Sequence, residues 1–469
     1  MTIKFYNTMS RSKEEFTSLK DNQVKMYTCG PTVYNYAHVG NFRAYIFEDI
    51  LRRTLKYYGY KVTQVMNLTD VDDKTIRDSQ VANVPLLEFT KKYKDAFFED
   101  IESLKIEKAE VYPAATDHIK EMVKLIQVLL GKKYAYQTDD GSIYFSISKF
   151  PEYGNLARID MENQRAGSRV KNDEYEKDSI ADFALWKAWD KSDGDVYWDS
   201  PWGKGRPGWH IECSAMSMKY LGRTFDIHTG GIDNMFPHHE DEIAQSECAN
   251  GVKFVNYWLH CEYLIVNGQK MSKSLGNFYT IRDLMEKGFT GEEIRWVLLS
   301  AHYRKKLNFT FESCKKAGET LKNFNSFFAR LKSVDNNDLT NQSEIEEIIS
   351  RNLEHFKNAI GDDMNISEAL AAVFTLQKEM NKKIIHNEIN REYAHKVLDA
   401  YKKFNEILAV FDFSDFEETI PAEVKEIVDE RQMARKNRDF KTSDLLRDKL
   451  KENGWIVEDT PTGPIVKKL

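Results

Sequence analysis

A strand, a helix and a second strand form the first regular pattern along the chain. The β-prone run at 24–28 ends in a Cys-Gly-Pro turn, and apolar positions at helical spacing then predict a helix over 38–58. Gly59 marks the end of that helix, and a second β-rich run follows at 61–68. Short connections of this kind are typical of a parallel sheet, so the pattern predicts the α/β fold class.

A different pattern occupies about residues 120 to 200. Residues 134–147 alternate around an Asp-Asp-Gly turn, which predicts a hairpin, and a polar, charged stretch follows. The α/β pattern resumes with a predicted helix at 209–220 and a predicted strand at 225–228. We therefore interpret the middle of the chain as an insertion that splits the parallel-sheet domain.

Helical spacing dominates the rest of the chain. From about residue 291, apolar residues recur on helix faces, which predicts a helical bundle with a polar internal loop at 335–343. Two charged helices and two short β-prone runs then have the pattern of a small C-terminal α+β module. The predicted domains are the two halves of the parallel-sheet domain at 1–120 and 201–265, the insertion at 121–200, a loop region at 266–315, the bundle at 316–415 and the C-terminal module at 416–469.

Composition restricts the environment of the protein. The 469 residues are 41% hydrophobic, enough for several sizeable cores, and no apolar stretch approaches the roughly 18 residues of a membrane span. The chain shows no export signal, and its five cysteines, an odd number, argue against a disulfide framework. We therefore expect a cytoplasmic protein with no membrane partner. The net charge of -7 restricts any nucleic-acid contact to local basic patches.

Two segments far apart in the sequence have the features of phosphate-binding elements. His38, Gly40 and Asn41 lie where a turn enters a helix, so backbone N–H groups and the helix dipole provide an anion site. Lys270 and Lys273, in a Lys-Met-Ser-Lys-Ser loop before a helix, supply charges suited to a transferring nucleotidyl group. Either motif alone also fits a solvated surface, but the two together indicate a site for a nucleotide phosphate.

Four residues have side chains that ligate zinc: Cys29, Cys213, His238 and Glu242. The last two are four residues apart, so a helix would project both from one face. The adjacent His-Glu pair invites a zinc-protease interpretation, but Ile243 stands where that motif needs a second histidine, so we discard it. Either cysteine alone is explained as well by a buried structural thiol. The four residues together predict one zinc ion.

Such a donor set suits the capture of a soft ligand. Two thiolates, an imidazole and a carboxylate carry enough negative charge to weaken zinc as a Lewis acid, so water activation is not its obvious task. A substrate thiol could ionise and coordinate zinc at roughly 2.3 Å, with the shell expanding or Glu242 loosening. A serine hydroxyl is a much poorer ligand, so the metal would select cysteine beyond the roughly 100-fold that a hydrophobic pocket achieves between such isosteres.

Four longer segments carry a resemblance to a known family. They are Met-Tyr-Thr-Cys-Gly-Pro-Thr-Val-Tyr at 26–34, Gly-Arg-Pro-Gly-Trp-His-Ile-Glu-Cys-Ser-Ala-Met at 205–216, Phe-Pro-His-His-Glu at 236–240 and Lys-Met-Ser-Lys-Ser at 270–274. Together they resemble the cysteinyl-tRNA synthetases, a family of class I aminoacyl-tRNA synthetases. The resemblance implies a Rossmann-like catalytic domain, activation of L-cysteine with ATP and Mg²⁺, and transfer to the 2′-hydroxyl of tRNA(Cys). A monomer is the expected state.

The resemblance also implies roles for individual residues. The four candidate ligands would hold one zinc ion, with Cys29 also at the edge of the substrate pocket. Lys273 would contact the ATP phosphates, with Lys270 in the same mobile loop. By the resemblance Thr69, Trp209 and Asp233 also belong to motifs that line the cysteine pocket, although packing or turn structure explains each of them as well.

One position departs from the family pattern. The first signature of the family is usually His-Ile-Gly-His, and Asn41 replaces its second histidine here. An amide can donate to a phosphate oxygen but carries no positive charge. The sequence therefore predicts a site that is weakened at this position or compensated elsewhere, but not abolished.

Basic residues gather in the last two predicted helices. They outnumber the acidic residues there and would form a phosphate-contacting surface beside the aromatic Trp455. By the resemblance this module reads the anticodon, whereas a solvated pair of charged helices explains the same pattern without RNA. The basic residues are Arg431, Arg435, Lys436, Arg438, Lys441, Arg447, Lys449 and Lys451.

Two other functions fit part of the pattern. A ligase that attaches cysteine to a small amino-sugar would use the same catalytic domain, but it needs neither the bundle nor the basic module. A non-catalytic zinc protein that binds RNA would need neither the lysine loop nor the phosphate-binding helix start. No editing domain is evident in the sequence, as expected if a metal selects the amino acid.

Overall fold

Two compact units make up the structure, Met1–Phe411 and Asp412–Leu469. The computed structural model describes residues 2–159, 168–169, 181–272, 275–336, 342–413, 421–437, 439–460 and 463–468. Each unit has its own apolar core. Among the helices of the described ranges, none is long and apolar enough to cross a lipid bilayer.

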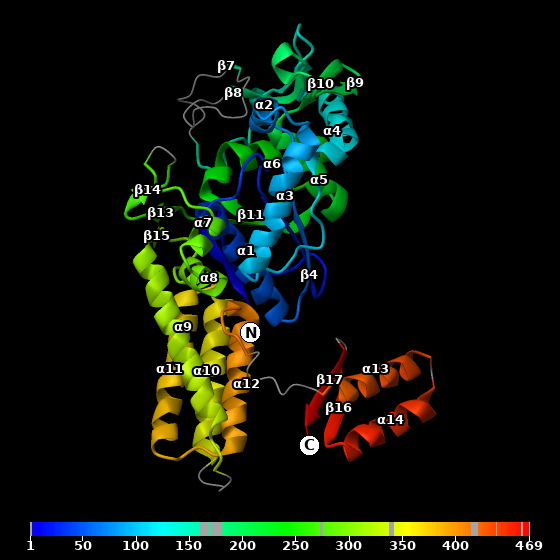
Figure 1. Cartoon of the computed structure of the whole chain (residues 1–469). Coiled ribbons are helices and arrows are strands. Elements are labelled where there is room, and N and C mark those ends of the chain that lie inside the picture. The colour runs from blue at the N-terminus through cyan, green and yellow to red at the C-terminus, as the bar shows by residue number, and fades with distance from the viewer. Residues whose placement is uncertain are drawn as a thin grey trace. The chain divides into compact units, whose positions relative to one another are not determined.

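A four-stranded parallel sheet forms the centre of the first unit (Figure 1). The strands are β3 at Gln23–Thr28, β4 at Lys61–Met66, β11 at Phe225–Gly231 and β12 at Val255–Cys261. Their order is β12-β11-β3-β4, and each neighbouring pair is parallel. The helix α1, at Val39–Tyr57, connects β3 to β4 as the pattern predicts. The α/β fold class is therefore confirmed, and the sheet joins strands from both sides of the insertion.

Helices pack on this sheet and share its core. They are α2 at Asp73–Val81, α3 at Leu86–Ser103, α4 at Ile119–Gly131, α5 at Trp209–Leu221 and α6 at Glu240–Asn250. Buried residues of β3, β4 and all five helices belong to one apolar cluster, which extends into the insertion. A short antiparallel pair, β1 at Lys4–Asn7 and β2 at Ser12–Glu15, precedes β3.

The insertion contains a second, largely antiparallel sheet of order β5-β6-β8-β10-β9, with β7 beside β8. The strands are β5 at Ala135–Gln137, β6 at Ile143–Phe145, β7 at Ser168–Arg169, β8 at Ala181–Ala188, β9 at Trp198–Ser200 and β10 at Gly203–Pro207. The predicted hairpin corresponds to β5 and β6. The β9–β10 hairpin carries this sheet beyond residue 200, where the insertion was predicted to end, because residues 201 and 202 form the turn of that hairpin.

A small sheet of order β14-β13-β15 follows the parallel sheet. Its strands are β13 at Leu264–Val266, β14 at Gln269–Lys270 and β15 at Leu307–Phe309, and two helices, α7 at Ile281–Glu286 and α8 at Gly291–Leu299, lie between β14 and β15. From about residue 291 the sequence predicts only helices, so β15 is not predicted. Three residues are too few to show the two-residue period of a strand, and β15 exists because it pairs with β13.

Four helices form the predicted bundle in the same unit (Figure 1). They are α9 at Phe311–Lys332, α10 at Gln342–Gly361, α11 at Ile366–Ile385 and α12 at Arg391–Leu408. The rings of Phe324, Phe328 and Tyr401 pack on one another in its core. Residues 337–341 of the predicted internal loop lie outside the described residues.

A buried arginine connects the bundle to the parallel-sheet domain. Arg295, in α8, donates hydrogen bonds to the carbonyl oxygens of Leu104, after α3, at 3.0 Å and of Leu408, at the end of α12, at 2.6 Å. It also pairs with the buried carboxylate of Asp49 in α1. A guanidinium is a favourable cap for these helix ends because their free carbonyls carry partial negative charge.

The second unit packs two helices against a β-hairpin. Its elements are α13 at Ala422–Lys436, α14 at Phe440–Glu452, β16 at Trp455–Thr460 and β17 at Gly463–Lys468. The core includes Val424, Ile427, Leu450 and Trp455. The predicted pair of charged helices followed by two short strands is therefore confirmed.

Candidate active site and metal centre

The four residues that the sequence indicates as zinc ligands lie together beyond the carboxyl end of the parallel sheet. Cys29 directly follows β3, Cys213 lies in α5, His238 precedes α6, and Glu242 lies in the first turn of α6. One ligand atom of each residue lies within 4.8 Å of the others, and all four side chains are buried. This edge is where α/β proteins bind their ligands.

An irregular chain path brings His238 beside Glu242. After β11, Phe236 has extended backbone angles (φ −137°, ψ 133°) between short helical turns, and the regular helix α6 begins only at Glu240. Nε2 of His238 lies 3.1 Å from Oε1 of Glu242. The side chains of His238 and Glu242 are therefore in contact although His238 precedes the regular helix.

The charges of this cluster suit a cation. Burial opposes ionisation of Cys213, but the hydrogen bond from Cys29 and the charge of His238 outweigh it and lower the pKa of Cys213 to about 6. The same hydrogen bond, together with burial, raises the pKa of Cys29 well above its usual value. Burial opposes protonation of His238, yet Cys213 and Glu242 raise its pKa to about 10. Burial also disfavours the Glu242 carboxylate, but His228 and His238 hold its pKa below the usual value.

Zinc fits these donors. Tetrahedral zinc, with bonds of about 2.3 Å to sulfur and about 2.0 Å to nitrogen or oxygen, places its ligand atoms roughly 3.3–3.8 Å apart. The ligand atoms here lie within 4.8 Å of one another, so a small contraction completes the shell. Two sulfurs and an imidazole favour zinc over Mg²⁺ or Ca²⁺, which prefer oxygen ligands.

A series of polar contacts orients the ring of His238 at the nitrogen that does not face Glu242. Its Nδ1 lies 2.8 Å from Nδ1 of His210, and Nε2 of His210 lies 3.2 Å from the carboxylate of Asp241. Tyr153 donates to the same carboxylate. Burial lowers the pKa of His210 well below its usual value, which keeps this ring neutral. Outer partners of this kind fix the orientation of a metal-ligating histidine.

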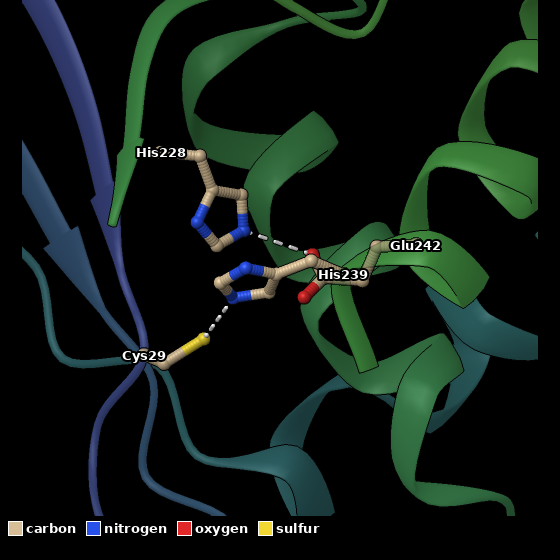
Figure 2. A group of neighbouring side chains, drawn as sticks. All are labelled: Cys29, His228, His239 and Glu242. Atoms are coloured by element: carbon tan, nitrogen blue, oxygen red, sulfur yellow. Dashed lines mark hydrogen bonds and ion pairs between the residues drawn. The ribbon is translucent and has the colours of Figure 1, made fainter. Parts of the chain in front are cut away.

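Three further histidines lie at this centre, and the sequence reasoning did not assign them to it. Nε2 of His228, in β11, lies 3.0 Å from Oε2 of Glu242, and Nε2 of His239 lies 3.3 Å from Sγ of Cys29 (Figure 2). His260, in β12, contacts His239 at 2.8 Å. A signal existed, because five of the 11 histidines of the chain fall between residues 210 and 260.

Of the three residues expected to line a cysteine pocket, Trp209 and Thr69 lie beside the candidate ligands or their chain neighbours. The ring of Trp209 stacks on His238 with 4.2 Å between centroids. Thr69 donates to Glu212 at 2.9 Å, one residue before the second cysteine ligand. Asp233 is exposed on the turn after β11, and its carboxylate lies against Gly231. Glu212 was not indicated by the sequence reasoning.

The predicted phosphate-binding helix start is closed by a capping box. The backbone N–H of Asn41 donates to Nδ1 of His38 at 3.1 Å, and that of His38 donates to Oδ1 of Asn41 at 3.0 Å. The oxygen of the Asn41 amide therefore caps α1 and its NH₂ group remains a possible donor. The cap gives a structural reason for asparagine where the family pattern has histidine.

This helix start lies beside the lysine loop, although the two are far apart in the sequence. A Cβ on Gly40 would lie 3.1 Å from Cε of Met271. Lys270 is exposed at the end of β14. Lys273 lies outside the described residues. The start of α1 and the lysine loop, which the sequence connected only by their suitability for phosphate, are therefore neighbours.

The second unit requires a correction to the predicted RNA surface. Arg431 is buried and pairs with both carboxylate oxygens of Asp459, at 3.0 and 2.9 Å, and Arg435 pairs with the same carboxylate. Trp455 is buried in the core. The prediction is wrong for Arg431 and Trp455, because counting charges and rings in a sequence does not reveal which of them pack inside. The predicted basic residues that are exposed are Arg435, Lys436, Lys441, Arg447, Lys449 and Lys451, and Phe440 is exposed as well, whereas Arg438 lies outside the described residues.

Three family models match successive parts of the chain. The tRNA synthetases class I (C) catalytic domain matches residues 15–319. The DALR domain matches residues 355–412, and the Cysteinyl-tRNA ligase anticodon binding domain matches residues 417–463. The first model alone covers the parallel sheet, the insertion and the lysine loop.

Curated relatives match along the full length. The cysteine--tRNA ligase of Protochlamydia amoebophila is 51% identical over 469 residues, with 99% of this chain and 98% of the relative covered. That of Brachyspira hyodysenteriae is 52% identical over 471 residues, with 98% of both covered.

Solved structures share the fold at low identity. Mycobacterium tuberculosis methionyl-tRNA synthetase in complex with methionyl-adenylate has a TM-score of 0.60 at 15% identity, covering 83% of this chain and 88% of that chain. The match of residues 15–319 to the class I catalytic domain, on a fold shared with that structure, defines a class I aminoacyl-tRNA synthetase. With relatives near 50% identity over its whole length, the chain belongs to the cysteine--tRNA ligase family, enzymes that form a carbon–oxygen bond.

Proposed function

We propose that this protein activates L-cysteine with ATP and transfers it to tRNA(Cys), and that a zinc ion selects the substrate by its thiol. In the first step the cysteine carboxylate attacks the α-phosphorus of ATP and pyrophosphate leaves. In the second step the 2′-hydroxyl of the terminal tRNA nucleotide attacks the adenylate carbonyl and AMP leaves. We expect a monomer.

The cluster of Cys29, Cys213, His238 and Glu242 carries the proposal. It is buried, its ligand atoms lie within 4.8 Å of one another, and Trp209 stacks on one of them. When bound, zinc supplies a soft Lewis acid that takes an ionised thiol and disfavours a hydroxyl. The protein holds the ion, excludes water from it and lines the place where the substrate side chain would enter.

The helix start and the lysine loop are proposed to bind ATP. Backbone N–H groups at Gly40 and the positive end of α1 suit its phosphates, and the NH₂ group of Asn41 can donate to a phosphate oxygen. Lys270 and Lys273 would neutralise charge as pyrophosphate leaves, with Mg²⁺ bound to the nucleotide. Positioning and charge neutralisation would dominate catalysis.

A cysteine-dependent exchange of labelled pyrophosphate into ATP tests the first step, with serine as the competing substrate. We expect Cys213→Ser to reduce cysteine activation by about 100-fold or more and to reduce the preference for cysteine over serine. Cys248→Ser is the matched control, because this buried thiol of α6 lies outside the cluster and its replacement leaves selectivity intact. Equal selectivity in the wild type and Cys213→Ser would refute the proposal.

The acceptor is tested separately. Transfer of labelled cysteine to tRNA(Cys) is expected, and the match of residues 417–463 to an anticodon binding domain supports tRNA over the small amino-sugar acceptor considered above. Activation of cysteine without transfer to tRNA would contradict this part of the proposal. Absence of any exchange would favour a non-catalytic zinc protein.

A further inference from the structure

Cys29 and Glu242 belong to two overlapping groups of metal-binding side chains. We refer to Cys29, Cys213, His238 and Glu242 as the thiolate set and to Cys29, His228, His239 and Glu242 as the histidine set. In each set, one ligand atom of every residue lies within 4.8 Å of the others, and all the side chains are buried. Figure 2 shows the histidine set, in which the ring of His239 is directed to the thiol of Cys29 and the ring of His228 to the carboxylate of Glu242.

His228 has the environment of a metal ligand. Its Nε2 lies 3.0 Å from Oε2 of Glu242, and its Nδ1 lies 3.2 Å from the backbone oxygen of Thr229. One ring nitrogen therefore faces the set while the other has a carbonyl acceptor behind it. This is the arrangement that fixes the tautomer of a ligating histidine.

His239 has an equivalent arrangement. Its Nε2 lies 3.3 Å from Sγ of Cys29, and its Nδ1 lies 2.8 Å from Nε2 of His260. Nδ1 of His260 in turn lies 2.8 Å from the hydroxyl of Thr8. The ring of His239 is therefore also oriented from behind, with one nitrogen toward the set.

The two shared ligands lie between the two sets. Oε1 of Glu242 lies 3.1 Å from His238, whereas Oε2 lies 3.0 Å from His228, so each carboxylate oxygen faces one set. Cys29 is hydrogen-bonded to Cys213 on one side and lies 3.3 Å from His239 on the other. Both shared residues can ligate an ion at either position with little movement.

Charge and bond chemistry favour different sets. With Zn²⁺, the thiolate set has two thiolates and a carboxylate and a net charge of about −1, whereas the histidine set is neutral with one thiolate and one carboxylate. Burial penalises net charge and so favours the histidine set. Stronger bonds from two thiolates favour the thiolate set.

We propose that the histidine set is a second zinc position, occupied in place of the thiolate set when the latter is incomplete. One ion binds at a time because both sets need Cys29 and Glu242. An ion in the second position no longer contacts His238, on which Trp209 stacks, so it is displaced from the proposed cysteine pocket. A measured content of one zinc ion per protein therefore does not show that the thiolate set is intact.

Two variants that each remove a ligand of the thiolate set only, Cys213→Ala and His238→Ala, test the proposal. The full-length proteins are loaded with Zn²⁺ or Co²⁺, the metal is counted by elemental analysis, and its ligands are read from X-ray absorption and from the cobalt–thiolate absorption band. The wild type is expected to bind one ion with two sulfur ligands. Both variants are expected to bind one ion with one sulfur and two imidazoles, and so to give the same spectrum.

Adding His228→Ala and His239→Ala to either variant leaves three ligands of the thiolate set and is expected to weaken zinc binding by about 100-fold or more, and circular dichroism verifies that each protein is folded. Cys248→Ala, which removes a buried thiol outside both sets, serves as the matched control with the wild-type spectrum. Folded single variants without zinc, different spectra for the two variants, or a zinc affinity unchanged by loss of both histidines would each overturn the proposal. Two ions in the wild type would overturn mutual exclusion. A wild type without zinc would instead refute zinc selection in the proposed function.

Discussion

Protons and zinc compete for the same atoms of the thiolate set. The raised pKa values keep a proton on Cys29 and on His238 at pH 7, whereas Cys213 and Glu242 are ionised. Zinc must displace both protons, so we expect about two protons to be released per ion bound. Zinc affinity is then expected to fall roughly 100-fold per unit as pH decreases from 8 to 6.5.

Calorimetry in buffers of different ionisation enthalpy measures this proton release. Competition with a chelator at several pH values gives the affinities independently. Release of no protons, or an affinity that does not change with pH, would show that the ligands are already deprotonated in the ion-free protein.

Glu48 is a buried carboxyl group whose ionisation destabilises the folded protein, whereas ionisation of an ion-paired acid stabilises it. Its side chain is fully buried in α1, accepts a hydrogen bond from Thr229 at 2.9 Å, and burial raises its pKa to about 8. Because the folded pKa is above the unfolded one, ionisation opposes folding, and the cost grows as pH rises from about 4.5 to about 8.

We therefore expect Glu48→Gln to stabilise the protein relative to the wild type increasingly over this pH range, with a ceiling of roughly 5 kcal/mol. Denaturant unfolding of both proteins at pH 5 and pH 8 measures the difference. A constant difference between the two pH values would mean that Glu48 does not titrate as inferred.

The start of α1 combines helix capping with the proposed nucleotide binding, and substitutions of Asn41 separate the two roles. Asn41→Asp keeps an acceptor for the backbone N–H of His38 but places a negative charge toward the phosphates. We expect it to preserve the thermal midpoint and to raise the KM for ATP in the exchange assay. Asn41→Ala keeps the bond from its backbone N–H to His38 but loses the acceptor for the backbone N–H of His38, and it is expected to destabilise the protein by about 0.5–1.5 kcal/mol. An unchanged KM for ATP in Asn41→Asp would place the phosphates elsewhere.

At the level of single elements, the sequence was informative where local chemistry decides the structure. The helix α1 was predictable because its apolar spacing, the turn before it and Gly59 after it all agree. The strand β15 was not, because only its pairing with β13 makes it a strand. Similarly, nothing local distinguishes Arg295 from a surface arginine, since its partners in α1, α3 and α12 come from distant parts of the chain.

In the whole molecule, the second unit is expected to contribute RNA affinity without affecting the chemistry of cysteine activation. Phe440 and Lys441 are exposed at the start of α14 and suit base stacking and phosphate contact. We expect the double variant Phe440→Ala, Lys441→Glu to weaken tRNA binding by about 10-fold or more and to leave pyrophosphate exchange unchanged.

Filter binding and the exchange assay measure the two quantities on the same protein. The double variant Glu423→Ala, Glu426→Ala, at exposed acidic positions of α13, is a control that should not weaken tRNA binding. Equal loss of binding and exchange in the Phe440→Ala, Lys441→Glu protein would indicate general misfolding, and no loss of binding would exclude this face from RNA contact.

The overall architecture could be predicted from the sequence, but the composition of the metal centre only in part. The parallel sheet, the bundle and the C-terminal hairpin were predictable because their segments show a clear hydrophobic period or are bounded by clear turn signals. Cys29, Cys213, His238 and Glu242 were found because their side chains are recognisable ligands. His228 was missed, because a histidine in a buried strand is as compatible with packing as with ligation until its neighbours are known. His239 was considered only in the zinc-protease interpretation, which Ile243 excludes.

The pairing of β3 with β11 has a further consequence for the insertion. These adjacent strands belong to halves of one domain that the insertion separates in the chain, and the candidate ligands Cys29 and His238 lie just beyond their carboxyl ends. An ion held there would act as a removable crosslink across the break, joining the halves independently of the polypeptide between them. The sheet of the insertion could then move, or vary in size, while Cys29 and His238 keep their positions relative to each other.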